Sequence, residues 1–207
     1  MIGGIELLKR LWYFIDYYPD VSVFVGVLVA SLIQLVLGNS LSVILSGLSV
    51  MFLVFLITLP VNILLKNIFK SRRPSRYYSY YSRGTVFEGS FPSFHAQFAF
   101  SEATAFIVAV LLFSPSGIRF VAVLAAAIIM IPMAFLVALS RVYLKIHYPI
   151  DVVGGIIIGC IIGSITTYIL APYMMSLPNT VYIIGAFMFF ILLHLLSLSR
   201  RRKSSSL

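Results

Sequence analysis

Residues 140–151 of the chain, SRVYLKIHYPID, place an arginine, a histidine and an aspartate between two apolar stretches. His147 and Asp151 are four positions apart, a spacing that brings two side chains together on one face of a helix. In that arrangement the carboxylate would accept a hydrogen bond from the imidazole, fix its tautomer and stabilise a positively charged ring. This is what a carboxylate does beside a catalytic histidine. Taken alone, the segment fits an interfacial salt-bridge cluster equally well.

A second cluster, KNIFKSRRP at residues 66–74, follows a long apolar run. Lys66 and Arg73 are seven positions apart, and a proline follows the arginine. Arginine offers a fork of N–H donors that matches phosphate oxygens, and lysine adds a compact positive charge. Taken alone, these residues are more typical of the basic side chains that flank membrane spans.

A third cluster, PSFHAQ at residues 92–97, precedes another apolar run. Proline suits the first turn of a helix, so a helix is predicted to begin here. Ser93, Phe94 and His95 would then present backbone N–H groups at a helix N-terminus, where anions bind readily. The alternative is an ordinary serine cap with His95 at the membrane interface.

Together the three clusters supply the parts of a site for phosphoryl transfer. Three cations, Lys66, Arg73 and Arg141, would hold a phosphoryl group and the extra charge of its transition state. One histidine would attack phosphorus and become phosphohistidine while the other protonates the leaving oxygen. His147, supported by a carboxylate, is the better nucleophile, and His95 is the better acid. No cluster of cysteines, histidines or carboxylates indicates a metal site.

The elements that must position these residues are membrane helices. The chain is 61% hydrophobic and 10% charged, whereas soluble domains are about 45–50% apolar. Six apolar runs approach the roughly 20 residues that a helix needs to cross a bilayer. We therefore expect an all-α, polytopic membrane protein with a bundle of six transmembrane helices. The six runs are 21–38, 41–65, 96–113, 120–139, 152–172 and 181–198.

Three segments are expected along the chain. Residues 1–20 mix basic and aromatic side chains and resemble a short interfacial amphipathic helix. Residues 21–198 form the membrane domain, and residues 199–207 form a basic tail. The single cysteine, Cys160, cannot form an internal disulfide.

Six crossings would place both termini and all three clusters on one face of the membrane. All of the fifteen lysines and arginines except Arg119 would lie on that face. The positive-inside rule therefore predicts that the catalytic face is cytoplasmic. The expected location is the plasma membrane. Basic residues beside apolar runs favour a membrane lipid as partner and argue against nucleic acid. A transporter would carry its charge nearer the membrane midplane.

The order and spacing of the motifs resemble the type 2 phosphatidic acid phosphatase family. The motifs are Lys-x6-Arg-Pro (Lys66 to Pro74), Pro-Ser-x-His (Pro92 to His95) and Ser-Arg-x5-His-x3-Asp (Ser140 to Asp151). The resemblance implies metal-independent hydrolysis of a lipid phosphate or diphosphate, with no cofactor. It also implies His147 as nucleophile, Asp151 as its partner and His95 as acid. The phosphate-binding residues that it implies are Lys66, Arg73, Ser93, Phe94 and Arg141.

Phe94 departs from the family pattern, which usually has glycine before this histidine. A backbone N–H remains, and the larger side chain is expected to narrow the head-group pocket. Glu102, seven residues after His95, is a possible further site residue that tunes His95 or pairs with an arginine.

The small, membrane-only chain resembles the lipid-carrier phosphatases of this family, and that resemblance favours polyprenyl diphosphate as substrate. Phosphatidic acid and phosphatidylglycerol phosphate remain alternatives, and so does a protein that binds or transports lipid phosphates without catalysis. The oligomeric state stays open. Gly155, Gly159 and Gly163 form a repeat of small residues that predicts close helix packing, inside the bundle rather than between two chains.

Overall fold

The computed structural model describes residues 12, 19–74, 88–175, 184 and 191 of the 207-residue chain. Its helices are α2 (Pro19–Val36), α3 (Leu41–Phe69), α5 (Phe94–Phe113), α6 (Arg119–Tyr143) and α7 (Pro149–Met175). No strand occurs among the described residues. The all-α prediction is therefore confirmed for this part of the chain.

Four of these helices, α3, α5, α6 and α7, are long and apolar enough to cross a membrane, which identifies the chain as an integral membrane protein. The apolar part of α2 that the structure describes, Ser22–Val36, is shorter than a full span. The sixth predicted run, 181–198, lies outside the described residues apart from two positions. The predicted interfacial helix at 1–20 also lies almost entirely outside them. The six-span bundle therefore stays a prediction beyond these four helices.

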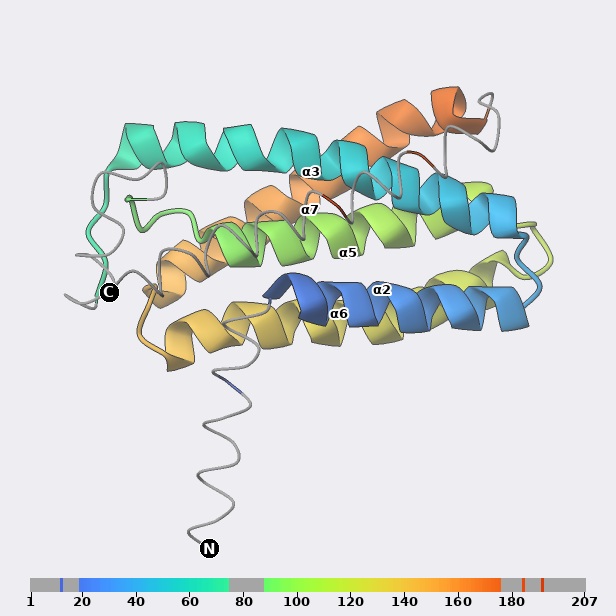
Figure 1. Cartoon of the computed structure of the whole chain (residues 1–207), viewed down its shortest axis with the longest axis horizontal. Helices are drawn as coiled ribbons and strands as arrows, with labels where there is room; N and C mark the ends of the chain where they lie inside the picture. Colours follow the sequence, from blue (N-terminus) through green and yellow to red (C-terminus); the bar gives the residue numbers. More distant parts are fainter. Residues whose placement is uncertain (1–11, 13–18, 75–87, 176–183, 185–190, 192–207) are drawn as a thin grey trace, which may run out of the picture.

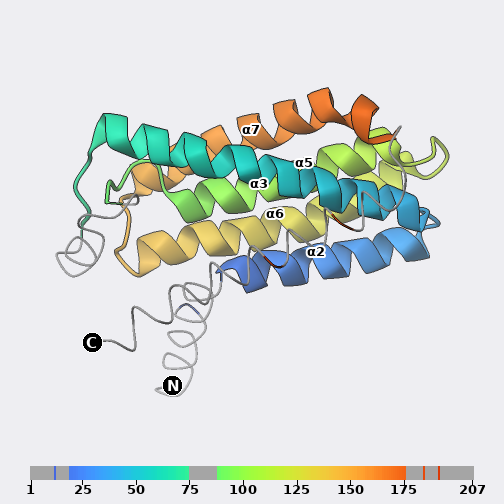
Figure 2. The ribbon, with the colours of Figure 1, turned by 45° about the horizontal axis from the view of Figure 1, so that its top comes forward.

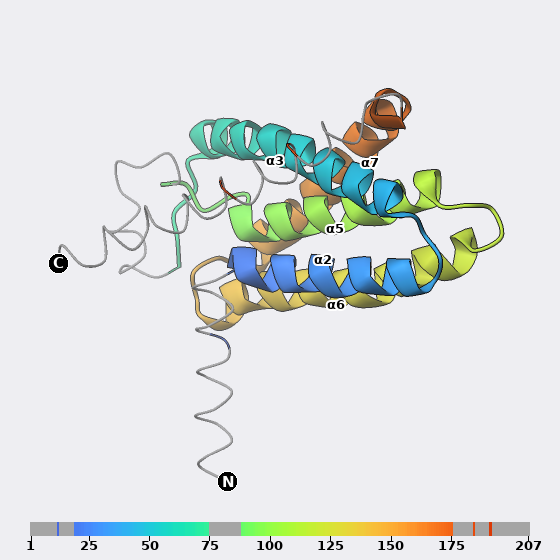
Figure 3. The same ribbon diagram turned by 45° about the vertical axis from the view of Figure 1, so that its right-hand side comes forward.

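Helix α5 is the centre of the bundle. It packs most extensively on α7, then on α6 and α3, while α2 lies chiefly on α6 (Figure 1). The same arrangement is visible in the two rotated views (Figure 2, Figure 3). Phe98 meets Phe55 of α3 edge to face, and Phe100 meets Phe135 of α6 in the same way. Small residues and aromatic rings alternate on α5, which lets neighbouring helices approach it on several sides.

The helix ends that carry the three sequence clusters lie at one end of the bundle (Figure 1). The C-terminal ends of α3 and α6 and the N-terminal ends of α5 and α7 meet there, and the short connections 37–40 and 114–118 lie at the other end. Several helices continue beyond the predicted apolar runs: α3 ends at Phe69 rather than 65, and α7 begins at Pro149 rather than 152. The polar site residues therefore sit on, or directly beside, helix termini.

The glycine repeat of α7 faces α5. A Cβ atom at Gly155 would lie 2.7 Å from the carbonyl oxygen of Ser93, and one at Gly159 would overlap the carbonyl of Gln97. At Gly163 it would overlap Ser101 and Thr104 in the same way. The prediction that this repeat packs inside the bundle is confirmed.

Replacing Gly159 by alanine is expected to destabilise the bundle. The added methyl meets backbone rather than a flexible side chain, so α5 and α7 must separate, at a cost of about 1–3 kcal/mol. We expect the Tm in detergent to fall by about 5 °C or more. Gly117→Ala is the matched control, because nothing lies within 4 Å of a Cβ atom at that position. An unchanged Tm for Gly159→Ala would contradict the close α5–α7 contact.

Hydrogen bonds between buried polar side chains join α3 to α5 inside the bundle. The Thr58 hydroxyl donates to Ser101 Oγ at 3.1 Å, and the Asn62 amide donates to Gln97 Oε1 at 2.6 Å. The same Asn62 amide donates to the carbonyl of Pro92 at 3.3 Å. Polar groups without water must find partners within the protein, so these bonds fix α3 against the first turns of α5.

Candidate active site

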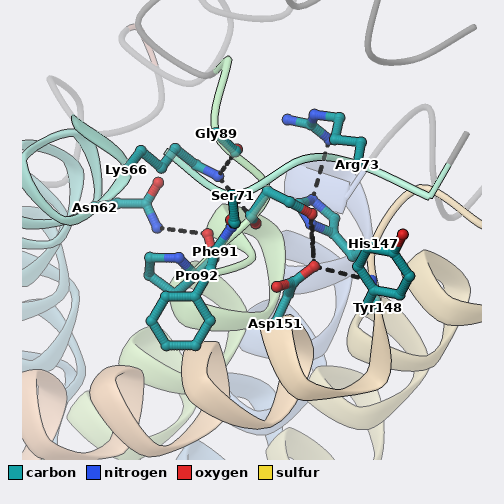
Figure 4. Close-up of polar contacts among 11 residues, drawn as sticks. Asn62, Lys66, Ser71, Arg73, Gly89, Phe91, Pro92, His147, Tyr148 and Asp151 are labelled. Atoms are coloured by element: carbon teal, nitrogen blue, oxygen red, sulfur yellow. Dashed lines mark hydrogen bonds and ion pairs between the residues drawn. The ribbon is translucent and has the colours of Figure 1, made fainter. Parts of the chain in front are cut away.

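Lys66 stands at the end of α3 with its side chain only 2% exposed. Its ammonium donates to the carbonyl oxygens of Gly89 at 2.6 Å and Ser90 at 3.3 Å (Figure 4). An ammonium carries three N–H donors, so one remains for an anion. Gly89 allows this approach, because a Cβ atom there would lie 3.0 Å from the Lys66 carbonyl oxygen. The lysine therefore anchors the loop before α5 and points its charge into the site.

Lys70 ends α3 in the left-handed region, with φ of 45°. The chain then turns back across the end of the bundle. This turn carries Arg73 over His147, where its Nη1 lies 3.3 Å from the imidazole Nε2 (Figure 4). The first and third sequence clusters are thus in direct contact, although 74 residues separate the two side chains.

His147 follows the end of α6 and precedes α7, so it lies in a connection and not in a helix. Lys145 adopts the left-handed region with φ of 55°, and the chain reverses there. The carbonyl oxygen of Arg141 then accepts from the amides of Ile146 at 3.0 Å and His147 at 3.2 Å. Arg141 is itself buried, 4% exposed. Its backbone holds His147 in place, and its guanidinium adds charge to the same region.

The expected direct hydrogen bond between His147 and Asp151 is wrong in detail. Nδ1 lies 3.7 Å from Oδ2, too long for a hydrogen bond, and the hydroxyl of Ser90 bridges the two groups. Ser90 Oγ lies 3.2 Å from Nδ1 and donates to Oδ2 at 2.5 Å. The carboxylate also accepts from the amide of Tyr148 at 2.9 Å (Figure 4). The spacing argument required a helix, and the connection before Pro149 instead leaves room for the serine.

This bridge defines the tautomer of His147. A hydroxyl has one hydrogen, and Ser90 gives it to Asp151, so Ser90 must accept the proton of Nδ1. Arginine can only donate, so Nε2 carries the lone pair and accepts an N–H of Arg73. The ring nitrogen that points towards the cations is therefore the one that carries the lone pair.

The surroundings also keep His147 neutral. Burial is the largest effect and lowers its pKa, to about 3, with the Asp151 carboxylate opposing the shift. The positive charges of Arg73, Lys66 and Arg141 act in the same direction as burial. A neutral imidazole at physiological pH keeps a lone pair on one of its ring nitrogens.

Ser93 lies at the N-terminus of α5, fully buried, and its side chain does not cap the helix. Its Oγ has no hydrogen-bond partner among the described residues, which is costly unless a ligand supplies one. The Ser93 amide was expected to be presented to an anion, and for this residue the expectation is wrong. It donates to the carbonyl of Asp151 at 2.9 Å, which ties the head of α5 to α7.

Phe94 is 8% exposed and packs into the hydrophobic core, with its ring 6.1 Å from that of Phe98 and 5.8 Å from that of His95. His95, half-buried, is the second residue of α5 and lies at the same end of the bundle as His147. The Phe94 ring packs inward, against the core. The expected narrowing of the head-group pocket by this side chain stays a prediction.

Glu102 is not brought to this site. Seven residues along α5 from His95, it lies about 10 Å deeper in the bundle and is fully buried. Neither carboxyl oxygen has a hydrogen-bond partner among the described residues, so the expected pairing with an arginine is not found there.

Two groups of residues were missed by sequence reasoning. Ser90 precedes the Pro-Ser-x-His motif by two positions and carries no signal of its own, because its role depends on where the loop crosses α7. Asn62 lies one turn before Lys66 on α3, and Gln97 lies one turn after Ser93 on α5. An amide inside an apolar run is costly in lipid, and that cost could have pointed to both.

No curated protein and no solved structure gave a significant match to this chain. The family model described as the PAP2 superfamily matches residues 41–175. This region is more than half of the chain, and it contains the three motifs and the four long apolar helices that bring them to one end of the bundle. The chain belongs to the PAP2 superfamily and is a membrane phosphatase.

Proposed function

We propose that the protein hydrolyses a lipid phosphate or diphosphate through a phosphohistidine at His147, and that its favoured reaction converts a polyprenyl diphosphate into the monophosphate. One observation supports this most: a neutral, buried imidazole has its Nδ1 proton bound through Ser90 to Asp151 and its Nε2 turned towards Arg73. Such an imidazole is activated on one side and faces a cation on the other.

In the first step the Nε2 lone pair attacks phosphorus and the bond to the leaving oxygen breaks. Arg73 and Lys66 stabilise the negative charge on the three equatorial oxygens, and the free hydroxyl of Ser93 binds one of them. His95 gives its proton to the leaving oxygen. The imidazole becomes positively charged as the N–P bond forms. The hydrogen bonds from Nδ1 to Ser90 and from Ser90 to the Asp151 carboxylate stabilise this charge.

In the second step water attacks the phosphohistidine. His95, now neutral, removes a proton from the water, the N–P bond breaks, and its electron pair returns to Nε2 of His147. Inorganic phosphate leaves, and both histidines regain their starting states. The protein cations carry the charge of both steps, so the proposed mechanism requires no metal.

The surroundings of the site suit a lipid substrate. Exposed apolar side chains border it, including Phe69 at the end of α3 and Ile150 at the start of α7, which are 56% and 66% exposed. A phosphate at the membrane interface could enter the site while the lipid tail stays among such side chains. The excess of basic residues at this end supports a cytoplasmic catalytic face.

Phosphate release from a lipid panel in detergent would test the proposal. We expect release from a polyprenyl diphosphate at least as fast as from phosphatidic acid or phosphatidylglycerol phosphate, and unchanged in the presence of EDTA. A labelled terminal phosphate should be trapped on the protein as an acid-labile, base-stable adduct. Loss of activity in EDTA would refute the metal-free mechanism. Binding of the lipids without any release would favour the non-catalytic alternative.

A further inference from the structure

A basic cavity of about 360 Å³ lies beside the catalytic residues. It is within the size range of small-ligand pockets, about 300–1,000 Å³. Four cations line it, namely Lys66, Lys70, Arg72 and Arg73, against one carboxylate, Glu88. Its charge therefore suits an anion.

The cavity shares a wall with the catalytic site. Lys66 and Arg73 line the cavity, and they also reach the catalytic residues: Arg73 lies 3.3 Å from Nε2 of His147, and Lys66 binds the carbonyl of Ser90. Ser93 and His147 do not line it. The cavity is thus separate from the catalytic site but adjacent to it, and the Arg73 guanidinium lies between the cavity and His147.

The segment that brings the extra cations is held in place. The Ser71 hydroxyl accepts from the amide of Phe91 at 2.7 Å, and the Ser71 carbonyl accepts from the amide of Ser90 at 2.9 Å (Figure 4). These two bonds fix the turn after α3 against the loop that precedes α5. Lys70 and Arg72 flank Ser71, so their backbone has a defined position beside the cavity.

The number of cations exceeds what one phosphoryl group needs. A phosphate monoester carries up to two negative charges, and Lys66, Arg73 and Arg141 already supply three positive ones near His147. Lys70 and Arg72 add two more on the cavity side only, against the single negative charge of Glu88. A diphosphate has a further phosphoryl group, with further charge, immediately next to the reacting one.

We propose that this cavity binds the second phosphoryl group of a lipid diphosphate, with Lys70 and Arg72 as the residues that distinguish a diphosphate from a monophosphate. The inference rests on the proposed function and deepens it. Nε2 of His147 attacks the terminal phosphorus, the bond to the bridging oxygen breaks, and that oxygen receives the proton of His95. The second phosphoryl group, still attached to the lipid, leaves from the cavity as a monophosphate.

The test compares a polyprenyl diphosphate with the monophosphate of the same chain length. For the double variant Lys70→Gln/Arg72→Gln we expect kcat/KM to fall about tenfold for the diphosphate and less than twofold for the monophosphate, because two partly solvated charge contacts contribute roughly this much. Lys145→Gln is the matched control, an exposed lysine on the same face and outside the cavity. An equal loss for both substrates would show general attraction of anions and overturn the proposal.

A binding measurement separates this inference from the proposed function. Inorganic diphosphate should raise the Tm of the wild-type protein more than inorganic phosphate does, and the double variant should lose that difference. If lipids are bound but not hydrolysed while diphosphate keeps its advantage, the catalytic proposal fails and the cavity assignment stands. If lipids are hydrolysed but diphosphate has no advantage, the reverse holds. Anionic membrane headgroups are the remaining possible occupant of the cavity. To test them, the kcat/KM comparison is repeated with increasing phosphatidylserine in the bilayer. An effect of the double variant that follows bilayer charge would assign the cavity to headgroups and contradict the proposal.

Discussion

Replacement of His147 by alanine is expected to lower kcat by about 10³–10⁵-fold, the range for removal of a covalent nucleophile. Without Nε2 no phosphoryl enzyme can form, so the trapped label should disappear together with the activity. Binding of substrate should change little, because the cations and the Ser93 hydroxyl remain. Phosphate release and labelling of the purified protein in detergent measure both effects.

The matched control for this variant is Tyr148→Phe. Tyr148 is the next residue, its side chain is 47% exposed, and its contribution to the site is a backbone N–H that donates to Asp151. The phenylalanine keeps that bond, so activity should stay near the wild-type level. A His147→Ala protein that elutes as wild type from a sizing column and still forms the labelled adduct would exclude His147 as the nucleophile.

The pH profile of the wild-type protein follows from the same residue. Attack requires the neutral imidazole, and burial holds the pKa of His147 at about 3, far below the ordinary value near 6.5. Lowering the pH from 7 to 5 should therefore not remove the nucleophile. We expect no acid limb of kcat/KM near pH 6.5 from this group. A limb at that pH that persists in variants of the other titratable residues would have to come from His147 and would contradict the assignment.

Much of this arrangement could be predicted from the sequence. The apolar runs fixed the long helices, because a backbone in lipid must satisfy its own hydrogen bonds. The number of crossings then placed Lys66, Ser93 and His147 at one end, and the structure places them there. The positions of the motifs at helix termini were predictable for the same reason.

The contacts inside the site were not predictable in the same way. His147 and Asp151 have helical spacing, yet the histidine precedes the helix, and only the path of the loop at residues 88–93 brings Ser90 between them. That path depends on Lys66, Ser71 and Asn62, which bind loop backbone across the bundle. Such bonds follow from tertiary packing, and no local pattern encodes them.

Ser90→Ala is expected to lower kcat by about 10- to 100-fold with little change in KM, because hydrogen bonds to charged groups contribute about 1.5–3 kcal/mol. The positive ring that forms during attack loses its link to Asp151, since Nδ1 is 3.7 Å from Oδ2 without the hydroxyl. Ser90→Thr keeps a hydroxyl and should recover part of the rate. Its Tm must be measured beside its activity, since Ser90 is fully buried and an added methyl has little room.

A double-mutant cycle separates the relay from a purely structural role of Ser90. If the hydroxyl acts by connecting His147 to Asp151, then Asp151→Asn already breaks the same connection, and adding Ser90→Ala should lower kcat only slightly further. If Ser90 merely supports the loop, the two losses should multiply. Steady-state kcat of the wild type, both single variants and the double variant, at one pH and with saturating lipid, gives the answer. If the losses in kcat of the two single variants do not multiply in the double variant, Asp151 acts on His147 through Ser90, a serine outside the three motifs. If the two losses multiply fully, Asp151 has no such role.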